Sequence, residues 1–200
     1  MNNLKNFLAL AFITTAFAQA GNREHRPSIS EQEQYPLHYA AATDNTGMVS
    51  SLIKTGSAQV DGFNKFGKTA LHQACQNGHL ATVKVLVEEC GANVNSKTTP
   101  KNKTALHKAA KQGYVDIVEY LLTKGALVNE VNAKGQTVLD IVEKRLAKIQ
   151  DGTLLKALLD GTKRGLDVYE ASLRDGSYEA DLLKTLEVLK ANGAKRASEL

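Results

Sequence analysis

The stretch TALHQACQNGH (residues 69–79) returns thirty-five residues later as TALHKAAKQGY (residues 104–114). Weaker copies of the same phrase surround Leu37 and Leu139, so the aligned leucines are spaced by 34, 35 and 33 residues. Self-similarity at a fixed period of roughly 20–50 residues is typical of solenoids, in which each repeat is one small supersecondary unit. The period therefore predicts a row of stacked repeats as the main body of the chain.

Within one period, the apolar residues predict a pair of short helices. Leu71, Ala74 and Cys75 lie at i, i+3 and i+4 and therefore share one helical face. Gly78 permits a tight turn into the next helix, and Gly91 ends that helix where a left-handed residue is usual. Helices this short are marginal alone, so they must bury their apolar faces against neighbouring pairs.

The repeated phrases resemble the ankyrin repeat, whose pattern is T-P-L-H-x-A-A, a G-H turn, V-V-x-L-L-L, and then G-A-x-V-N with a hairpin. The first copy departs from this pattern, because Tyr35 replaces the threonine and Asp44 the turn glycine. The resemblance implies an all-α solenoid of stacked helix-turn-helix units with protruding hairpin loops and a helical C-terminal cap. The matching residues of the second and third copies are Thr69, Leu71, His72, Ala74, Gly78, His79, Val83, Leu86, Gly91, Ala92, Val94, Asn95, Thr104, Leu106, His107, Ala109, Ala110, Gly113, Val118, Leu121, Leu122, Gly125, Ala126, Val128 and Asn129.

The chain divides into a leader, a tail, the repeats and a cap. Repeat two has one extra residue before Gly91, and insertions of this kind are expected to map to loops and leave the stacking intact. After residue 137 the pattern loses its glycine turn, and residues 153–160 are expected to supply the partner helix. The expected divisions are 1–20 signal peptide, 21–34 polar N-terminal tail, 35–159 ankyrin repeats (about 35–67, 68–102, 103–135 and a degenerate 136–159) and 160–200 helical cap.

The first twenty residues predict export from the cytoplasm. MNNLKNFLALAFITTAFAQA has one lysine, an apolar run from Phe7 to Ala18 and the small-x-small end Ala18-Gln19-Ala20. This is the plan of a secretory signal peptide, and the run is about half of the roughly 20 residues needed to span a bilayer. We expect a secreted or periplasmic protein with no membrane span after cleavage; an uncleaved anchor is the alternative.

Composition and motifs argue against several functional classes. The net charge of +4 becomes +3 without Lys5, and no cluster of Lys and Arg stands out, so nucleic acid is not an expected partner. No nucleophile motif, phosphate-binding loop or zinc spacing is present. We therefore expect a monomeric protein that is not an enzyme, with no catalytic residue, no cofactor and no metal site.

The histidines and cysteines have structural interpretations. His38, His72 and His107 occupy one position in three repeats, and a residue set by the period is not expected to be catalytic. The ankyrin resemblance implies that each ring bonds the opening threonine and nearby backbone. Cys75 and Cys90 are separated by a helix on the order of 15 Å long, too far for a disulfide. We expect two thiols, with Cys75 buried and Cys90 accessible.

Ankyrin stacks usually bind proteins through the hairpin tips and the concave helical face, which is what the resemblance implies here. The tips carry lysines, which predict a partner with an acidic surface or serve only to keep the loops soluble. Of the two phenylalanines in the first tip, one is expected to be an exposed hot spot and the other buried. The predicted partner-binding residues are Phe63, Lys65, Phe66, Lys68, Lys97, Lys101, Lys103 and Lys134.

Three functions remain open at this point. The first is a non-enzymatic protein-protein interaction module that is exported across a membrane. The second is an accessory or inhibitory subunit of an exported enzyme, linked to oxidant protection, with Cys90 as a redox contact. The third is an enzyme whose site lies in the irregular end of the chain, where the acidic residues lack a fixed spacing. Those acidic residues are Asp151, Asp160, Asp167, Glu170 and Asp175.

Overall fold

A computed structural model of the chain describes residues 34–151 and 176–200. The predicted signal peptide, residues 21–33 of the tail and the expected helix at residues 153–160 lie outside these residues. The described part is all-helical, without a β-strand, so the predicted all-α solenoid is confirmed. Its helices are α3 (Pro36–Ala42), α4 (Thr46–Lys54), α5 (Ala70–Asn77), α6 (Leu80–Lys84), the π-helical turn η2 (Val85–Glu89), α7 (Ala105–Gln112), α8 (Val115–Thr123), α9 (Val138–Gln150), α12 (Ser177–Ala191) and the 3-10 turn η4 (Ala197–Glu199).

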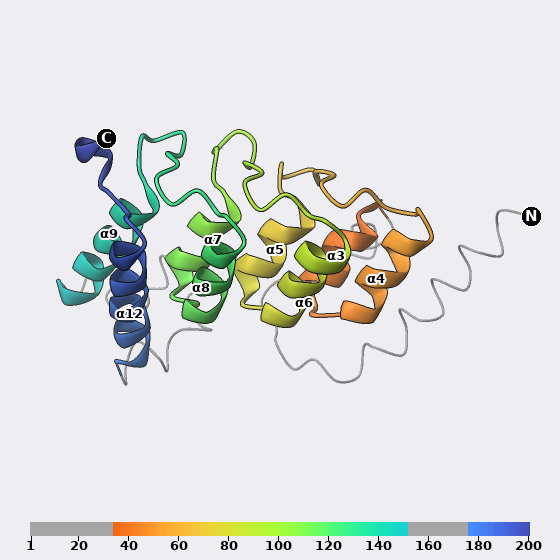
Figure 1. The fold of residues 1–200 in the computed structure, drawn as a ribbon, viewed down its shortest axis with the longest axis horizontal. Coiled ribbons are helices and arrows are strands. Elements are labelled where there is room, and N and C mark those ends of the chain that lie inside the picture. Colours follow the sequence, from red (N-terminus) through yellow and green to blue (C-terminus); the bar gives the residue numbers. More distant parts are fainter. Residues whose placement is uncertain (1–33, 152–175) are drawn as a thin grey trace, which may run out of the picture.

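The helices form two layers in a single row, with the hairpin loops along one edge (Figure 1). In the first layer α3 packs on α5, α5 on α7, and α7 on α9. In the second layer α4 contacts α6 and η2, and α6 contacts α8. Alanines at the equivalent positions 40, 74 and 109 are completely buried, which lets the first-layer backbones approach one another closely.

The helix α12 completes the fourth repeat, although it is far from α9 in sequence. It packs against α8 and α9, where the second helix of that repeat belongs. Asn129 Nδ2 donates to the carbonyl of Gly193 at 3.1 Å, and the amide of Lys195 donates to Asn129 Oδ1 at 2.8 Å. Asn95 makes the same pair of bonds with Gly125 and Leu127 in the preceding repeat.

The C-terminal part of the segment expected to be a cap therefore supplies a repeat helix. Residues 152–175 stand between the two helices of repeat four, in a place where the other repeats have only a short turn. This insertion breaks the period, which is why α12 could not be assigned to its repeat from spacing. The residue boundary expected near 159 falls outside the described residues and stays a prediction.

The extra residue of repeat two lies in a helix, so the expectation that it maps to a loop is wrong; a change of helix type absorbs it. In repeat three the amide of Ala126 donates to the carbonyl of Leu121, five residues back. In repeat two the amide of Ala92 donates to the carbonyl of Leu86, six residues back, after the π-helical turn η2. A π-helical turn places one extra residue in a helix without moving its two ends, so the stack is preserved.

The recurring threonine and histidine form a buried network at the start of each first-layer helix. The Oγ1 of Thr69 lies 2.8 Å from Nδ1 of His72, and its amide donates to the same nitrogen at 3.3 Å. Because Nδ1 accepts, Nε2 carries the proton and donates at 2.9 Å to the carbonyl of Lys103 in the next repeat. His107 forms the same contacts with Thr104, so the expected structural role of these rings is confirmed.

This network predicts how stability depends on pH. Burial lowers the pKa of His72 and of His107 from 6.5 to about 4. Between pH 6.5 and 4 the unfolded chain therefore binds more protons than the folded chain. As the pH falls through this range, each histidine lowers the free energy of unfolding by up to about 1.4 kcal/mol per pH unit. Urea unfolding at pH 7.5, 6.5, 5.5 and 4.5 should show the free energy of unfolding falling across this window.

The control is a chain with both His72→Gln and His107→Gln. It should be less stable than the wild type at pH 7.5, because the bonds to the next repeat are altered, but its stability should change less between pH 6.5 and 4.5. A wild-type stability that stays flat down to pH 4.5 would contradict the buried, neutral state of these rings.

Candidate protein-binding groove

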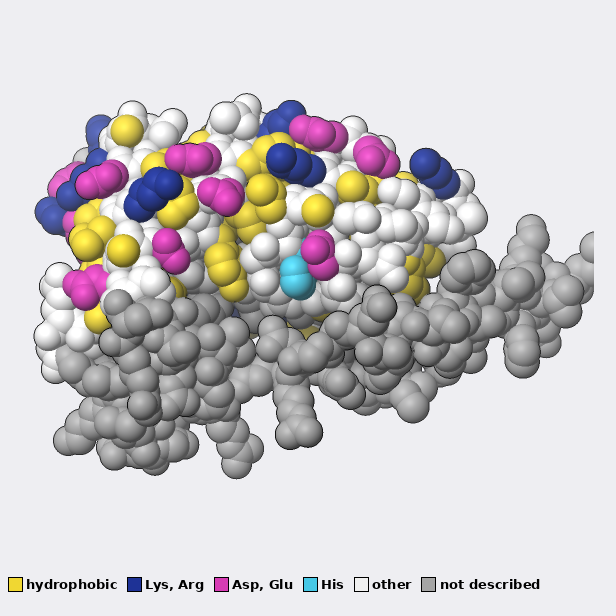
Figure 2. Space-filling model, turned by 90° about the horizontal axis from the view of Figure 1, so that it is seen from below, with side chains coloured by type: hydrophobic (Ala, Val, Ile, Leu, Met, Phe, Trp, Pro, Cys, Tyr) yellow, Lys and Arg dark blue, Asp and Glu magenta, His cyan; other side chains and the backbone are white. Residues whose placement is uncertain are grey.

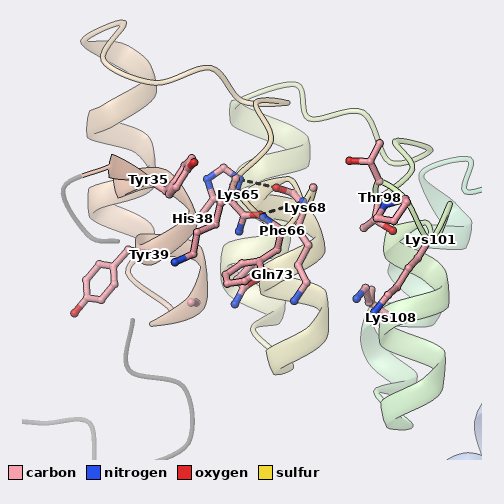
Figure 3. A pocket seen from close by; sticks show the side chains of 15 residues that line it. Tyr35, His38, Tyr39, Lys65, Phe66, Lys68, Gln73, Thr98, Lys101 and Lys108 are labelled. Carbon is pink, nitrogen blue, oxygen red and sulfur yellow. Dashed lines mark hydrogen bonds between the residues drawn. The ribbon is translucent and has the colours of Figure 1, made fainter. Parts of the chain in front are cut away.

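An open groove of about 810 Å³ runs along the concave side of the first-layer helices, below the first two hairpin tips (Figure 3). The α3, α5 and α7 helices supply its floor, and the tips supply one wall. No Asp or Glu is among the described residues that line it. The lining residues are Tyr35, His38, Tyr39, Ala42, Asn64, Lys65, Phe66, Gly67, Lys68, Gln73, Thr98, Thr99, Pro100, Lys101 and Lys108.

The repeat itself places the side chains of the groove floor. Each buried histidine is followed by one residue that faces the groove: Tyr39 in repeat one, Gln73 in repeat two and Lys108 in repeat three. In a helix, neighbouring residues point about 100° apart, so anchoring the histidine in the core turns the next side chain toward the concave side. The stack thus displays one variable residue per repeat in a row.

The first hairpin tip is held in shape by Asn64. Its Oδ1 accepts from the amides of Phe66 at 3.0 Å and Lys68 at 3.1 Å, which closes the turn by side-chain bonds. With the turn filled by this amide, Phe63 and Phe66 both remain on the surface, 50% and 59% exposed. The expectation that one of the two would be buried is therefore wrong, because the hairpin interior holds backbone and Asn64 rather than a ring.

Neighbouring tips are joined into one wall by backbone hydrogen bonds. The amide of Thr99 donates to the carbonyl of Gly67 at 3.0 Å, and the amide of Ala133 donates to the carbonyl of Lys101 at 3.1 Å. Gly67 has φ +63, and a Cβ on it would collide with the side chain and carbonyl of Thr99. Glycine is required there by both conformation and space.

The electrostatics of the groove are dominated by Lys68, Lys101 and Lys108, which we call the lysine cluster. The ammonium groups of Lys68 and Lys108 donate to the same acceptor, Gln76 Oε1, at 2.9 and 3.4 Å. No member of the cluster forms an ion pair with a carboxylate of residues 34–151 or 176–200. Burial, reinforced by the neighbouring lysines, lowers the pKa of Lys108 to about 7.

The structure brings together some of the predicted partner-binding residues and separates others. Lys65, Phe66, Lys68 and Lys101 line the groove. Lys97 instead forms an ion pair with Glu130. The remaining three, Phe63, Lys103 and Lys134, do not line the groove. Burial lowers the pKa of the half-buried Lys103, and the charges of Lys101 and Lys134 lower it further.

Comparison with known proteins agrees with this architecture. A family profile described as ankyrin repeats (3 copies) matches residues 8–98, and one described as ankyrin repeats (many copies) matches residues 88–142. The chain belongs to the ankyrin repeat family. The first match begins inside the predicted signal peptide, whose cleavage stays a prediction.

Several curated ankyrin proteins are similar over part of their length. NF-kappa-B inhibitor alpha of Gallus gallus is 40% identical over 126 residues, which cover 61% of this chain and 38% of that protein. Its counterpart in Rattus norvegicus is 37% identical over 102 residues, 48% of this chain and 32% of that protein. Palmitoyltransferase AKR1 of Yarrowia lipolytica is 41% identical over 76 residues, which cover 38% of this chain and 11% of that protein.

This ankyrin chain thus spans well under two thirds of the length of these relatives. An inhibitor and a palmitoyltransferase are both similar to this chain but differ in their named activities, so the resemblance establishes the fold and not one activity. What the family supports directly is a protein-protein interaction module, a role for which ankyrin repeats typically need no chemistry of their own.

The side of the ankyrin stack away from the loops differs from the groove. On the described part of this face, acidic and basic side chains alternate with small hydrophobic areas (Figure 2). No helix among residues 34–151 and 176–200 has the length and hydropathy to cross a membrane. The described part of this face thus lacks the single charge sign that characterises the groove lining.

Neither cysteine of the ankyrin stack has the lowered pKa that is typical of a reactive thiol. Both are free thiols, Cys75 buried and Cys90 half-buried, so the expected absence of a disulfide between them is confirmed. Burial raises the pKa of the Cys75 thiol, and burial together with Glu89 raises that of Cys90. A thiol with a raised pKa is a poor nucleophile at neutral pH. Within the described residues, no three His, Cys, Asp or Glu side chains are arranged to hold a metal.

The ankyrin fold should become more stable when Lys108 is replaced by an apolar residue. We expect Lys108→Met to raise the free energy of unfolding by about 1 kcal/mol, because the amine loses solvation and faces other lysines. Urea unfolding at pH 7.5 measures this change. The control Lys184→Met removes an exposed lysine on α12 and should change stability by less than about 0.5 kcal/mol. A destabilised Lys108→Met chain would show that the amine is well accommodated.

Thiol chemistry gives a second check. In the native protein, a maleimide or disulfide reagent should modify Cys90 slowly and Cys75 only at the rate of unfolding, because Cys75 is completely buried. Mass spectrometry of peptides after timed labelling at pH 7.5 distinguishes the two, and Cys90→Ser is the control. Fast labelling of Cys75 in the folded chain would contradict its burial.

Proposed function

We propose that this ankyrin chain is a monomeric, non-enzymatic interaction module that is exported across a membrane and binds an acidic surface of a partner protein. The observation that carries the proposal is the lysine cluster: Lys68 and Lys108 both donate to the Gln76 amide oxygen, and no cluster member has a carboxylate partner among the described residues. Charges left uncompensated in a concave site are complementary to an anionic ligand.

Exposed aromatic groups beside the lysine cluster support a protein as the partner. Phe66 lies on the rim of the groove with Lys65 Nζ 5.0 Å from its ring centre. Aromatic and cationic side chains that share one patch are typical of the energetic centre of protein interfaces. The tip wall, tied together by the bonds from Thr99 and Ala133, holds this patch in place before a partner arrives.

Export is supported by the leader sequence alone. Its lysine, apolar run and Ala18-Gln19-Ala20 end follow the plan of a secretory signal peptide. On this proposal the mature chain starts near Gly21 and acts in a periplasm or outside the cell. The N-terminal residue of the protein recovered from secreted and periplasmic fractions tests this part separately.

The second candidate is an inhibitory or accessory subunit of an exported enzyme. The similar protein NF-kappa-B inhibitor alpha is named as an inhibitor, which supports an inhibitory role for a stack of this kind. The raised pKa of Cys90 gives no support to an added redox role. An enzyme captured by the chain and slowed by it in a groove-dependent manner would favour this candidate.

Capture experiments test the main proposal. The wild-type chain should retain one partner from native secreted and periplasmic fractions, and a chain with Lys65→Ala, Phe66→Ala and Lys68→Ala should lose most of it. Quantitative mass spectrometry of the retained proteins measures the loss.

A charge-matched control separates the groove from the overall charge. Lys54, Lys184 and Lys190 are exposed on α4 and α12, and their joint change to alanine should leave capture unchanged. Both variants should unfold at about the wild-type temperature. Equal loss of the partner in both, or full retention in the groove variant, would rule out the groove as the binding surface.

A further inference from the structure

The groove has two chemically different ends. Tyr35, the residue before α3, and Tyr39 on α3 line one end, while Lys101 and Lys108 lie at the α7 end (Figure 3). Phe66 on the tip wall lies between them. A ligand that fills the whole groove would therefore meet aromatic rings at one end and ammonium groups at the other.

The spacing of the helices sets the length of such a ligand. Packed helices lie about 8–10 Å apart, so the two steps from α3 to α5 and from α5 to α7 cover roughly 20 Å. An extended peptide advances about 3.3 Å per residue. About six extended residues would bridge the aromatic end and the lysine end.

The lysine end of the groove has enough positive groups to bind more than one carboxylate. Lys68 and Lys108 converge on Gln76 Oε1, a dipole that supplies no negative charge to either amine. Charge from Lys101 acts on both Lys68 and Lys108, and it contributes with burial to their lowered pKa values. Two carboxylates in this position would favour the protonated form of all three amines and offset their mutual repulsion.

We infer that the groove binds an extended acidic segment of the partner protein, about six residues long, with an aromatic residue at the α3 end and at least two carboxylates at the α7 end. This inference rests on the proposed function and adds the chemistry and the order of the bound segment. The two ends of the groove recognise side chains. The order of the aromatic residue and the carboxylates in the segment therefore decides in which N-to-C direction its backbone runs along the groove.

A nucleic acid fits this groove less well than an acidic peptide. Nucleic-acid surfaces carry a continuous basic track that follows the phosphate backbone, with a high domain charge. Here the cluster occupies one end of a short groove, the chain has a net charge of only +4, and the described face away from the loops mixes both signs (Figure 2). The aromatic end would be left without a phosphate contact.

Fluorescence anisotropy with short labelled peptides and the full chain tests the inference. The probes are FGSEEE, its reversal EEESGF, the shuffle EEGFSE, and FGSQQQ, in which glutamine replaces glutamate. One of the first two should bind about tenfold more tightly than the shuffle, because only an ordered probe reaches both ends at once. The glutamine probe should bind at least about tenfold more weakly than its glutamate parent.

Matched variants locate the binding. Lys68→Gln, Lys101→Gln and Lys108→Gln together should weaken the preferred probe by about tenfold or more. Lys54→Gln, Lys184→Gln and Lys190→Gln remove the same charge from exposed positions on α4 and α12 and should change the affinity by less than about twofold. Tyr39→Ala should weaken the ordered probe but leave the binding of the shuffle unchanged.

Three results would overturn the inference. They are equal affinity for the ordered and shuffled probes, equal weakening by the two lysine triples, or equally tight binding of a single-stranded oligonucleotide of the same charge. The proposed function fails separately: if capture of the natural partner depends on the groove while no peptide binds, only the segment chemistry is wrong. If no groove-dependent partner is captured, the proposed function itself fails.

Discussion

The rest of the structure depends on the hydrogen bond that a buried, neutral histidine makes to the next repeat. His72 accepts from the Thr69 amide through Nδ1 and donates through Nε2 to a carbonyl of the following hairpin. This single ring therefore starts its own helix and fixes where the next repeat begins. The bond requires a neutral ring, and the completely buried surroundings that lower the pKa of His72 also keep it neutral. Stacking of the repeats therefore depends on these histidine rings remaining unprotonated.

The same constraint positions the binding groove. The carbonyls that accept from His38 and His72 belong to Lys68 and Lys103, so the backbone of these two lysines is anchored by the stacking network itself. The residue after each histidine is turned toward the concave side, which places Lys108 opposite Lys68 across Gln76. A groove assembled from anchored backbone loses little conformational freedom when a ligand binds. The side chains that face the groove differ from repeat to repeat, whereas the backbone arrangement that holds them is the same.

Much of the fold could be predicted from the period, and the exceptions occur where the period is broken. Repeats two and three follow from two phrases with one spacing, and Asp44 could replace a turn glycine because its φ of 56 is accessible to aspartate. The role of α12 could not be predicted, because residues 152–175 separate it from α9. Half of the predicted binding residues lie in the groove. Lys108 was not among them, because the prediction rested on the hairpin tips, although its place directly after His107 marks a concave position.

The lysine cluster is the place where the chain departs from what packing alone would favour. At a half-buried helix position between two other lysines, an apolar or neutral side chain would avoid both the loss of solvation and the repulsion that lower the pKa of Lys108. Elsewhere the stack follows local rules closely, with alanines where backbones approach and threonines at the helix starts. Local costs that the fold does not require tend to mark functional sites, because a partner that brings the missing charge turns them into binding energy. On the proposed function the groove is such a site, because an anionic ligand would favour the protonated form of Lys108 and offset the repulsion among the three amines.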